Sequence, residues 1–349
     1  MKKRMILLFT VILTAGSIVS ACGSQAQSDT AAESTTQEAA ATEDAAEETG
    51  DEEYEFGKLD IQALGDGVCG APAYIAYEKG FFAEEGLDVT LVSGTFETNK
   101  AGLSSGNYTV ANGDFQFFPS VNEGLDIKVI GGLHQGCIKI VVPPGSDIKT
   151  AADLAGKNIG VDEVGGTPMA VTSVLLANND IDPTTGVTWL AYPLDQLTAA
   201  VDKGEIDAFA AWDPYGTFAE QEGYTVLSDL STDPLFADKF CCFLYASGKE
   251  IEENPERVAA IWRAYEKAID WIGENPAEAA QIEIDQGYVA SEDVDLITEL
   301  LESYNFSTEH DTAKEDVEYF TEELKKTGYL PDSIDTKEFT DNLYYDVNS

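Results

Sequence analysis

Short runs of β-branched and apolar residues alternate with helix-like stretches along this chain, and this alternation limits the folds that the chain can adopt. Strand-like runs lie at 59–64, 88–92, 108–111 and 127–130, and the pattern then resumes at 158–161, 188–191, 208–212 and 225–227. Strands that alternate with helices favour parallel sheets covered on both faces. We therefore predict an α/β fold in which each half of the pattern forms a Rossmann-like lobe.

The order of the segments predicts where the chain passes between the two lobes. Lobe 1 is expected to comprise residues 57–142 and 241–349, and lobe 2 to comprise residues 143–240. The chain then crosses twice, near 141–144 and near 238–240, and two crossovers form a hinge. In open α/β sheets ligands bind beyond the carboxyl ends of the strands, which here would face the cleft between the lobes.

Helix start signals in the second half support this division. Thr150 and Asp153 have the spacing of a capping box. Thr167, followed by Pro168, is expected to cap the next helix. The loop before that helix would present unpaired backbone N–H groups to an acceptor group of a ligand.

The N-terminus carries an export signal. Three basic residues precede a short apolar run at 5–13, which is shorter than a membrane-spanning helix. Small residues then lead into Cys22, a pattern that resembles a bacterial lipobox. We predict a lipoprotein signal peptide at 1–21, lipidation of Cys22 and an acidic, disordered tether at 22–56. The alternative is an ordinary signal peptide that happens to end near a cysteine.

The charge balance excludes some partners. The chain has 64 Asp and Glu against 20 Lys and Arg, a formal net charge of −44. Such a chain repels phosphate backbones and anionic lipid surfaces, so we predict no nucleic-acid partner. The 44% hydrophobic content is too high for a chain disordered throughout.

Five stretches of the body together resemble one known family. They are AYIAYEKGFFAEEGL at 73–87, GLDIKVI at 124–130, SDIK at 146–149 running on to DLAGK at 153–157, GEIDA at 204–208, and WDPY at 212–215. The set is similar to the solute-binding proteins of nitrate, sulfonate, taurine and thiamine-precursor ABC importers. The resemblance implies a type II periplasmic-binding-protein fold without catalytic apparatus or cofactor.

The same resemblance implies how the protein works in the cell. A bacterial solute-binding lipoprotein lies at the extracytoplasmic face of the membrane, captures a small molecule as a monomer and delivers it to permease and ATPase subunits. The different-class alternative is an enzyme on the same fold, related to pyrimidine-precursor synthesis. The export signal argues against that alternative.

The loops at the predicted strand ends contain the candidate ligand contacts. Beyond the signal segment the chain has two arginines, Arg257 and Arg263, and both lie on a C-terminal helix, so no arginine is available to clamp an anion. Carboxylates with aromatic faces suit a flat, neutral or cationic ring, although a sulfonate or taurine-like ligand stays open. The candidate contacts are Asp66, Cys69, Tyr74, Thr95, Phe96, Glu97, Asn99, Phe115, Gln116, His134, Gly165, Gly166, Thr167, Trp212, Asp213 and Tyr215.

Four cysteines remain after Cys22, and three interpretations of them stay open. The run 137–142 is predicted to neighbour the strand that begins at Cys241, which would bring Cys137 near Cys241 or Cys242. Buried free thiols are expected first and a disulfide from Cys137 second. A metal or thiol-ligand site of His134 with Cys69 and Cys137 comes last, because no close CxxC spacing supports it. We therefore assign no metal.

Overall fold

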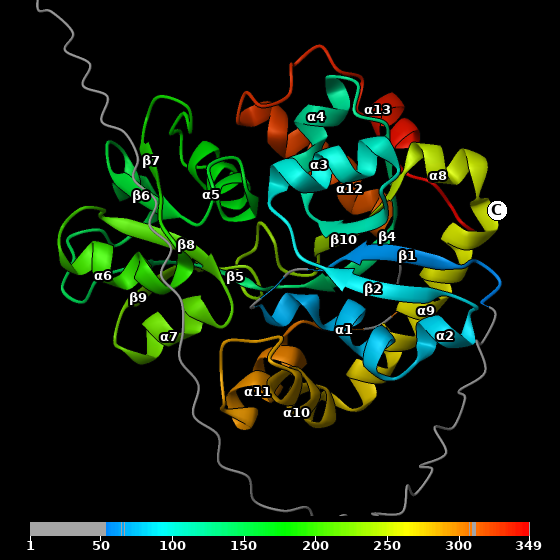
Figure 1. The fold of residues 1–349 in the computed structure, drawn as a ribbon. Helices are drawn as coiled ribbons and strands as arrows, with labels where there is room; N and C mark the ends of the chain where they lie inside the picture. Colours follow the sequence, from blue (N-terminus) through cyan, green and yellow to red (C-terminus); the bar gives the residue numbers. More distant parts are fainter. Residues whose placement is uncertain (1–53, 64, 66, 307, 309–311, 349) are drawn as a thin grey trace, which may run out of the picture. The chain divides into compact units, whose positions relative to one another are not determined.

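The computed structural model describes residues 54–63, 65, 67–306, 308 and 312–348 (Figure 1). The predicted signal peptide, Cys22, most of the predicted tether and the candidate contact Asp66 lie outside these residues. Among the described helices, none is both long enough and apolar enough to cross a bilayer.

Two five-stranded sheets form the centre of the described chain. The first has the order β2-β1-β3-β10-β4, with β1 at Lys58–Gln62, β2 at Asp88–Val92, β3 at Tyr108–Gly113, β4 at Ile127–Gln135 and β10 at Phe240–Ser247. The second has the order β7-β6-β8-β5-β9, with β5 at Ile138–Val142, β6 at Asn158–Val161, β7 at Thr188–Ala191, β8 at Ala208–Trp212 and β9 at Thr225–Asp229. The predicted α/β class and its repetition are confirmed.

Two features of the sheets differ from the prediction. The run 138–142, assigned to the first lobe, pairs with β8 and β9, so the chain leaves the first sheet at 136–137 rather than near 141–144. Both sheets are also mixed, because β5 and β10 run antiparallel to their neighbours. The physical reason is common to both strands. Each strand enters its sheet from the other sheet, at the carboxyl ends of the parallel strands, and is therefore antiparallel to them.

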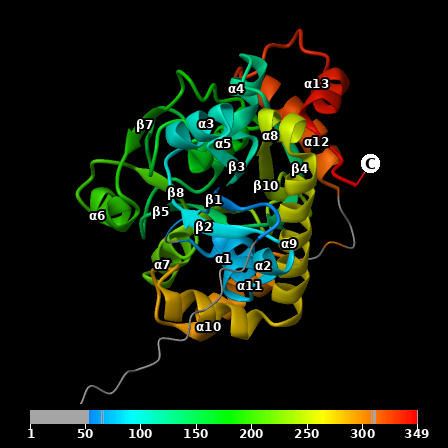
Figure 2. The same ribbon diagram turned by 45° about the vertical axis from the view of Figure 1, so that its right-hand side comes forward.

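Helices cover both faces of each sheet (Figures 1 and 2). Around the first sheet, α1, α2 and α9 pack on one side, and α3, α12 and α13 on the other. In the second sheet α5 covers one face, and α6 and α7 the other. Their bounds are α1 Ala71–Glu78, α2 Phe81–Glu84, α3 Phe96–Ser105, α4 Phe118–Asn122, α5 Thr167–Ala177, α6 Leu197–Asp202, α7 Tyr215–Gln221, α8 Gly248–Glu253, α9 Pro255–Glu274, α10 Pro276–Gln286, α11 Val294–Ser303, α12 Ala313–Lys326 and α13 Thr336–Leu343.

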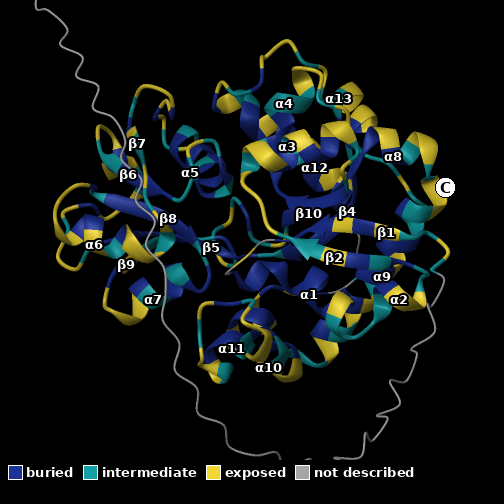
Figure 3. Cartoon of the chain, viewed as in Figure 1, coloured by how far each residue is buried: buried dark blue, intermediate teal, exposed yellow. Residues whose placement is uncertain are grey.

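The inner strands of both sheets are buried on both faces (Figure 3). In β8, Phe209 and Ala211 belong to a buried cluster with residues of α6 and α7, whereas Ala210, between them, packs with Leu175 of α5. Successive strand residues point to opposite faces, so a strand covered on both sides needs an unbroken apolar run. The sequence Ala-Phe-Ala-Ala of β8 provides that run.

Gly131 of β4 provides a test of the packing in the first sheet. A Cβ at this position would lie 2.0 Å from the ring of Trp262, a buried residue of α9. We expect Gly131→Ala to lower the free energy of unfolding by about 3 kcal/mol, because the strand is hydrogen-bonded to β10 and the indole is buried, so neither can move aside freely. Urea denaturation checks this, with Gly65→Ala as control, since a Cβ there has only an ordinary contact at 3.7 Å. Equal unfolding midpoints for the two variants would contradict the packing.

Candidate ligand site

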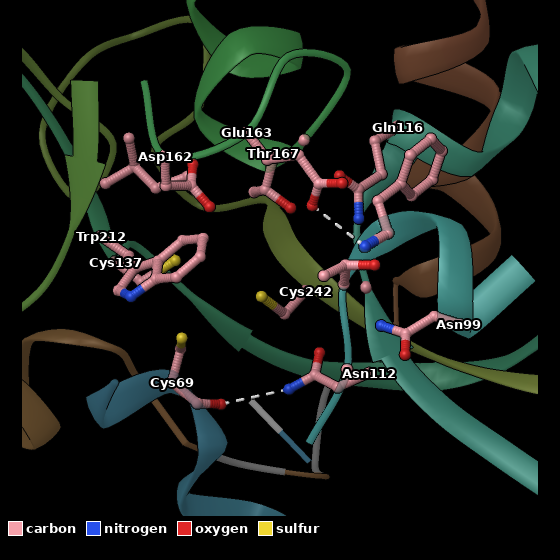
Figure 4. A pocket seen from close by; sticks show the side chains of 16 residues that line it. Cys69, Asn99, Asn112, Gln116, Cys137, Asp162, Glu163, Thr167, Trp212 and Cys242 are labelled. Carbon is pink, nitrogen blue, oxygen red and sulfur yellow. Dashed lines mark hydrogen bonds between the residues drawn. The ribbon is translucent and has the colours of Figure 1, made fainter. Parts of the chain in front are cut away.

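A cavity of about 400 Å³ lies between the two sheets, at the carboxyl ends of their parallel strands (Figure 4). Asn112 and Gly113 end β3, Trp212 ends β8, and Asp162 directly follows β6. This is the position at which open α/β sheets bind ligands. The lining residues are Cys69, Gly94, Thr95, Phe96, Asn99, Asn112, Gly113, Gln116, Cys137, Ile138, Asp162, Glu163, Gly166, Thr167, Trp212 and Cys242.

Half of the sixteen predicted contacts line this cavity. They are Cys69, Thr95, Phe96, Asn99, Gln116, Gly166, Thr167 and Trp212. Phe115 and Gly165 line a neighbouring cavity of about 230 Å³ that shares Phe96 and Gln116. Thr167 is the first residue of α5 rather than its cap, because Gly166 holds the cap position with extended backbone. The predicted capping box of Thr150 and Asp153 is present, on a 3₁₀ turn.

Three further predicted contacts lie away from the cavity. Tyr74 is buried on α1 and stacks on Tyr288 with ring centroids 4.2 Å apart. Glu97 faces solvent and pairs with Lys100 at 2.7 Å. Tyr215 packs edge-on against Phe218 beside the core of the second sheet. The rings of Tyr74 and Tyr215 contribute to packing. A sequence pattern alone does not show whether an aromatic residue packs in the core or contacts a ligand.

Asp213 and His134 lie in buried positions next to the cavity rather than on its wall. Asp213 accepts a hydrogen bond from Thr217 at 2.6 Å and faces a smaller cavity with Lys139. Burial raises the pKa of Asp213 to about 6, and the positive charge of Lys139 limits that rise. His134 belongs to a cluster with three cysteines behind the cavity wall.

Sequence reasoning left several lining residues out of the candidate set. Asn112, Gly113 and Asp162 stand at or just after strand ends, so the strand-end rule itself could have found them. The strand-end rule could not have found Ile138 and Cys242. They line the cavity because they lie near the start of β5 and β10, just after the chain passes between the sheets.

The cavity wall carries unpaired acceptors beside the N–H groups of its amide and indole side chains. Four side-chain oxygens on its wall are buried without a hydrogen-bond partner: Asn99 Oδ1, Asn112 Oδ1, Gln116 Oε1 and Asp162 Oδ1. Asn112 Nδ2 donates to the Cys69 carbonyl at 3.3 Å, which fixes the amide with Oδ1 free (Figure 4). The indole N–H of Trp212 is a buried donor that also has no partner. Because buried polar groups are normally paired, this wall is complementary to a guest rich in N–H or O–H groups.

The charges on the wall are negative. Asp162 and Glu163 line the cavity, and no Lys or Arg does so among the described residues. Burial raises the pKa of Asp162 to about 6. This carboxyl is therefore largely ionised at pH 7 and takes up a proton as the pH falls through 6. An inorganic anion would therefore meet a carboxylate without a cation to offset it.

Glu163 connects the two sides of the cavity. Its carboxylate, on the loop before α5, accepts a hydrogen bond of 3.1 Å from the backbone N–H of Phe96, the first residue of α3 (Figure 4). A carboxylate at a helix N-terminus is favoured by the unpaired N–H groups and the helix dipole. This contact joins the loop before α5 to the start of α3, and both segments line the cavity.

Four buried free thiols lie on or behind the cavity wall. Cys137 Sγ is 3.1 Å from Cys241 Sγ, although the predicted pairing of their strands is wrong. Cys137 comes close because it lies two residues beyond β4, the strand that pairs with β10. Hydrogen bonds from Cys137 and Cys241 lower the pKa of Cys242 well below that of an ordinary thiol. Burial opposes a charge on His134, but the Cys242 thiolate raises its pKa to about 10.

Comparison with known proteins gives consistent relatives. The chain is 26% identical over 286 residues to a putative aliphatic sulfonates-binding protein of Bacillus subtilis, covering 78% of this chain and 83% of that protein. It is 27% identical over 227 residues to a formylaminopyrimidine-binding protein of Halalkalibacterium halodurans, covering 60% and 64%. The crystal structure of the periplasmic nitrate-binding protein NrtA from Synechocystis superposes with a TM-score of 0.66 at 21% identity, over 82% of this chain and 85% of that one.

The fold and the family are thereby established. The structural likeness shows the fold of periplasmic binding proteins, which confirms the expectation from the sequence. The family model described as NMT1/THI5 like matches residues 70–279, more than half of the chain. This chain belongs to the NMT1/THI5-like family.

Proposed function

We propose that this protein is the extracytoplasmic solute-binding component of an ABC importer and that its ligand is a small N–H-rich heteroaromatic ring, such as an aminopyrimidine. The observation that carries the proposal is the cavity wall, which has unpaired acceptors, a carboxylate and the indole of Trp212 but, in the part of the chain that the structure describes, no Lys or Arg. A cavity of about 400 Å³ suits a single-ring compound. The relatives, named as solute-binding proteins, support the transport role.

The wall distinguishes between the ligands that the relatives' names suggest. A sulfonate or nitrate offers only acceptor oxygens and negative charge, so it would leave the fixed Asn112 oxygen unpaired and stand beside Asp162. An aminopyrimidine offers ring N–H or amino donors to these oxygens and a flat face to Trp212. An unsatisfied buried acceptor costs about 1–3 kcal/mol, so the Asn112 oxygen and the charge of Asp162 together favour the ring.

The cellular setting remains part of the same proposal. We propose a lipid anchor on Cys22 at the outer face of the membrane, monomeric capture of the ligand, and delivery to permease and ATPase subunits. An enzymatic role would need a reaction of the bound molecule, and release of the ligand unchanged would speak for a receptor.

Co-purified ligand tests the proposal. The protein is isolated from cells grown in rich medium, denatured, and its released small molecules are identified by mass spectrometry. We expect a nitrogen heterocycle in near-stoichiometric amount, and much less of it from an Asp162→Asn variant prepared in parallel. Recovery of an alkanesulfonate in place of a heterocycle would overturn the assigned ligand class.

The contact of Glu163 predicts an effect on ligand release. Glu163→Ala removes the hydrogen bond to the Phe96 N–H, and charged hydrogen bonds contribute about 1.5–3 kcal/mol. We expect the ring ligand to dissociate roughly 10-fold faster, with a smaller change in association. Stopped-flow tryptophan fluorescence measures both rates. Glu97→Ala is the matched control, because Glu97 is the next residue of α3 but faces solvent. Equal dissociation rates in both variants would show that the Glu163 contact does not slow ligand release.

A further inference from the structure

Two chain segments meet behind the cavity wall and bring together four metal-ligating side chains. His134 lies near the end of β4, Cys137 lies two residues beyond that strand, and Cys241 and Cys242 are the second and third residues of β10. The two strands are antiparallel neighbours with His134 opposite Cys242. We call these four residues the thiol cluster. Each of them is buried.

The spacing of the donor atoms suits one tetrahedral ion. With metal–sulfur bonds of about 2.3 Å, donors at the corners of a tetrahedron lie about 3.8 Å apart. Cys241 Sγ is 3.7 Å from Cys242 Sγ and 3.1 Å from Cys137 Sγ. All four donor atoms lie within 4.8 Å of one another. A shift of about an ångström or less would place them around a single ion.

The protein also holds the cluster in a strained and incompletely satisfied form. Cys137 has a φ of 86°, in the left-handed region that non-glycine residues rarely adopt, at a cost of about 1–2 kcal/mol. His134 stacks on Tyr304 and contacts the Gln135 carbonyl through Nδ1, while its Nε2 is buried without a partner. A metal-binding histidine usually donates one ring N–H to a backbone carbonyl and ligates through the other nitrogen, which here is Nε2. Strain and an unpaired donor both indicate a missing binding partner.

We propose that the thiol cluster binds one thiophilic metal ion of the Zn²⁺ class through His134, Cys137, Cys241 and Cys242. Three thiolates with one imidazole form a soft donor set of the kind that holds zinc in closed sites. Binding replaces protons: as Zn²⁺ enters, three protons leave the four residues, and the three thiolates and one neutral imidazole then coordinate it. No oxidation is involved.

The position of the ion gives it a role in the two-sheet arrangement. Cys137 lies at the first crossover, and Cys241 and Cys242 follow the second, so one ion would join both connections between the sheets. Cys137 and Cys242 also line the ligand cavity, and the ion would therefore lie at its wall (Figure 4). The site rests on these contacts and is independent of the ligand class proposed above.

Zn²⁺ itself is the probe. The full chain, reduced and stripped of metal, is titrated with Zn²⁺ against a chromophoric chelator, and its melting temperature is followed. We expect one ion per chain, a submicromolar Kd, and a rise of several degrees in Tm, because an ion that binds the folded state stabilises it by mass action. Zinc uptake below 0.2 ion per chain, with the thiols demonstrably reduced, would overturn the proposal.

Variants and a spectroscopic measurement separate the donors. Cys241→Ser is expected to weaken Zn²⁺ binding at least 100-fold, whereas Cys69→Ser, which removes a cavity thiol outside the cluster, changes it less than threefold. Equal losses in the two would contradict the assigned donors. If Cys241→Ser does not fold, Co²⁺ added to the wild-type chain decides: thiolate-to-cobalt charge-transfer bands support the site, and their absence overturns it. A Cys137–Cys241 disulfide that resists reduction in the folded chain would also overturn it, since the short sulfur contact would then belong to a covalent bond.

Discussion

Replacing Trp212 with alanine is expected to weaken binding of the ring ligand by roughly 30–100-fold, or about 2–3 kcal/mol. The indole stands at the end of β8 on the cavity wall, and its N–H is a buried donor without a partner in the protein. Alanine removes both the stacking surface and that donor. Titration calorimetry measures the loss, and Trp212→Phe should recover most of it by restoring an aromatic face.

A tryptophan remote from the cavity serves as the control for this result. Trp271 on α9 is partly buried, with the Lys79 ammonium 4.4 Å from its ring centre. Trp271→Ala should leave ligand affinity unchanged while removing a comparable side chain. Ligand-induced fluorescence quenching should persist in Trp271→Ala and largely vanish in Trp212→Phe. Full affinity in Trp212→Ala would mean that the ring does not rest on this wall.

Asp162→Asn is expected to weaken the same ligand by about 10–100-fold at pH 8, since a charge-assisted hydrogen bond contributes about 1.5–3 kcal/mol. The wild-type pKa near 6 also predicts a pH profile. Below pH 6 the carboxyl takes up a proton and can no longer accept as an anion, so wild-type affinity should fall as the pH drops from 8 to 5. The Asn variant should lack that component of the profile. Titrating both proteins at each pH separates the carboxyl from the ligand's own ionisation.

Stability should change in the opposite direction. The pKa of Asp162 is raised by burial from its ordinary value of 3.8, so the folded state holds a proton more tightly than the unfolded chain. This group therefore destabilises the fold increasingly as the pH rises from about 4 to 6, and above that by a constant amount. We expect Asp162→Asn to gain about 1 kcal/mol in unfolding free energy at pH 8 and little at pH 4, measured by urea denaturation. A loss of stability together with a loss of affinity would indicate a structural rather than a ligand-binding role.

Much of the fold could be predicted from the sequence, because most strands are marked by residues within or next to them in the chain. The runs at 88–92, 158–161, 188–191 and 208–212 match β2, β6, β7 and β8 to the residue, since apolar runs bounded by glycine and proline are sufficient to mark them. The membership of β5 was not predictable in this way. Residues 138–142 read as a buried strand in either sheet, and only the crossover at 136–137 decides between them.

The candidate site was predictable only in part, for a similar reason. Residues 95–99 and 165–167 come shortly after strands. They were predicted because ligands bind at the carboxyl ends of strands in this class of fold. Tyr74 and Tyr215 are tyrosines, like many residues that stack on ligands. In the structure, however, Tyr74 is buried in the core and Tyr215 packs beside a core cluster. The cluster of His134 with three cysteines depends on the pairing of β4 with β10, strands more than a hundred residues apart in the chain.

We propose that the cavity selects a hydrogen-bond-donating ring over an anion. Calorimetric titration of the ligand-free protein at pH 7.5 with an aminopyrimidine and, separately, with an alkanesulfonate tests this selectivity directly. We expect saturable one-to-one binding of the aminopyrimidine with a micromolar or tighter Kd, and no measurable binding of the sulfonate at millimolar concentration. Tight sulfonate binding without aminopyrimidine binding would contradict it.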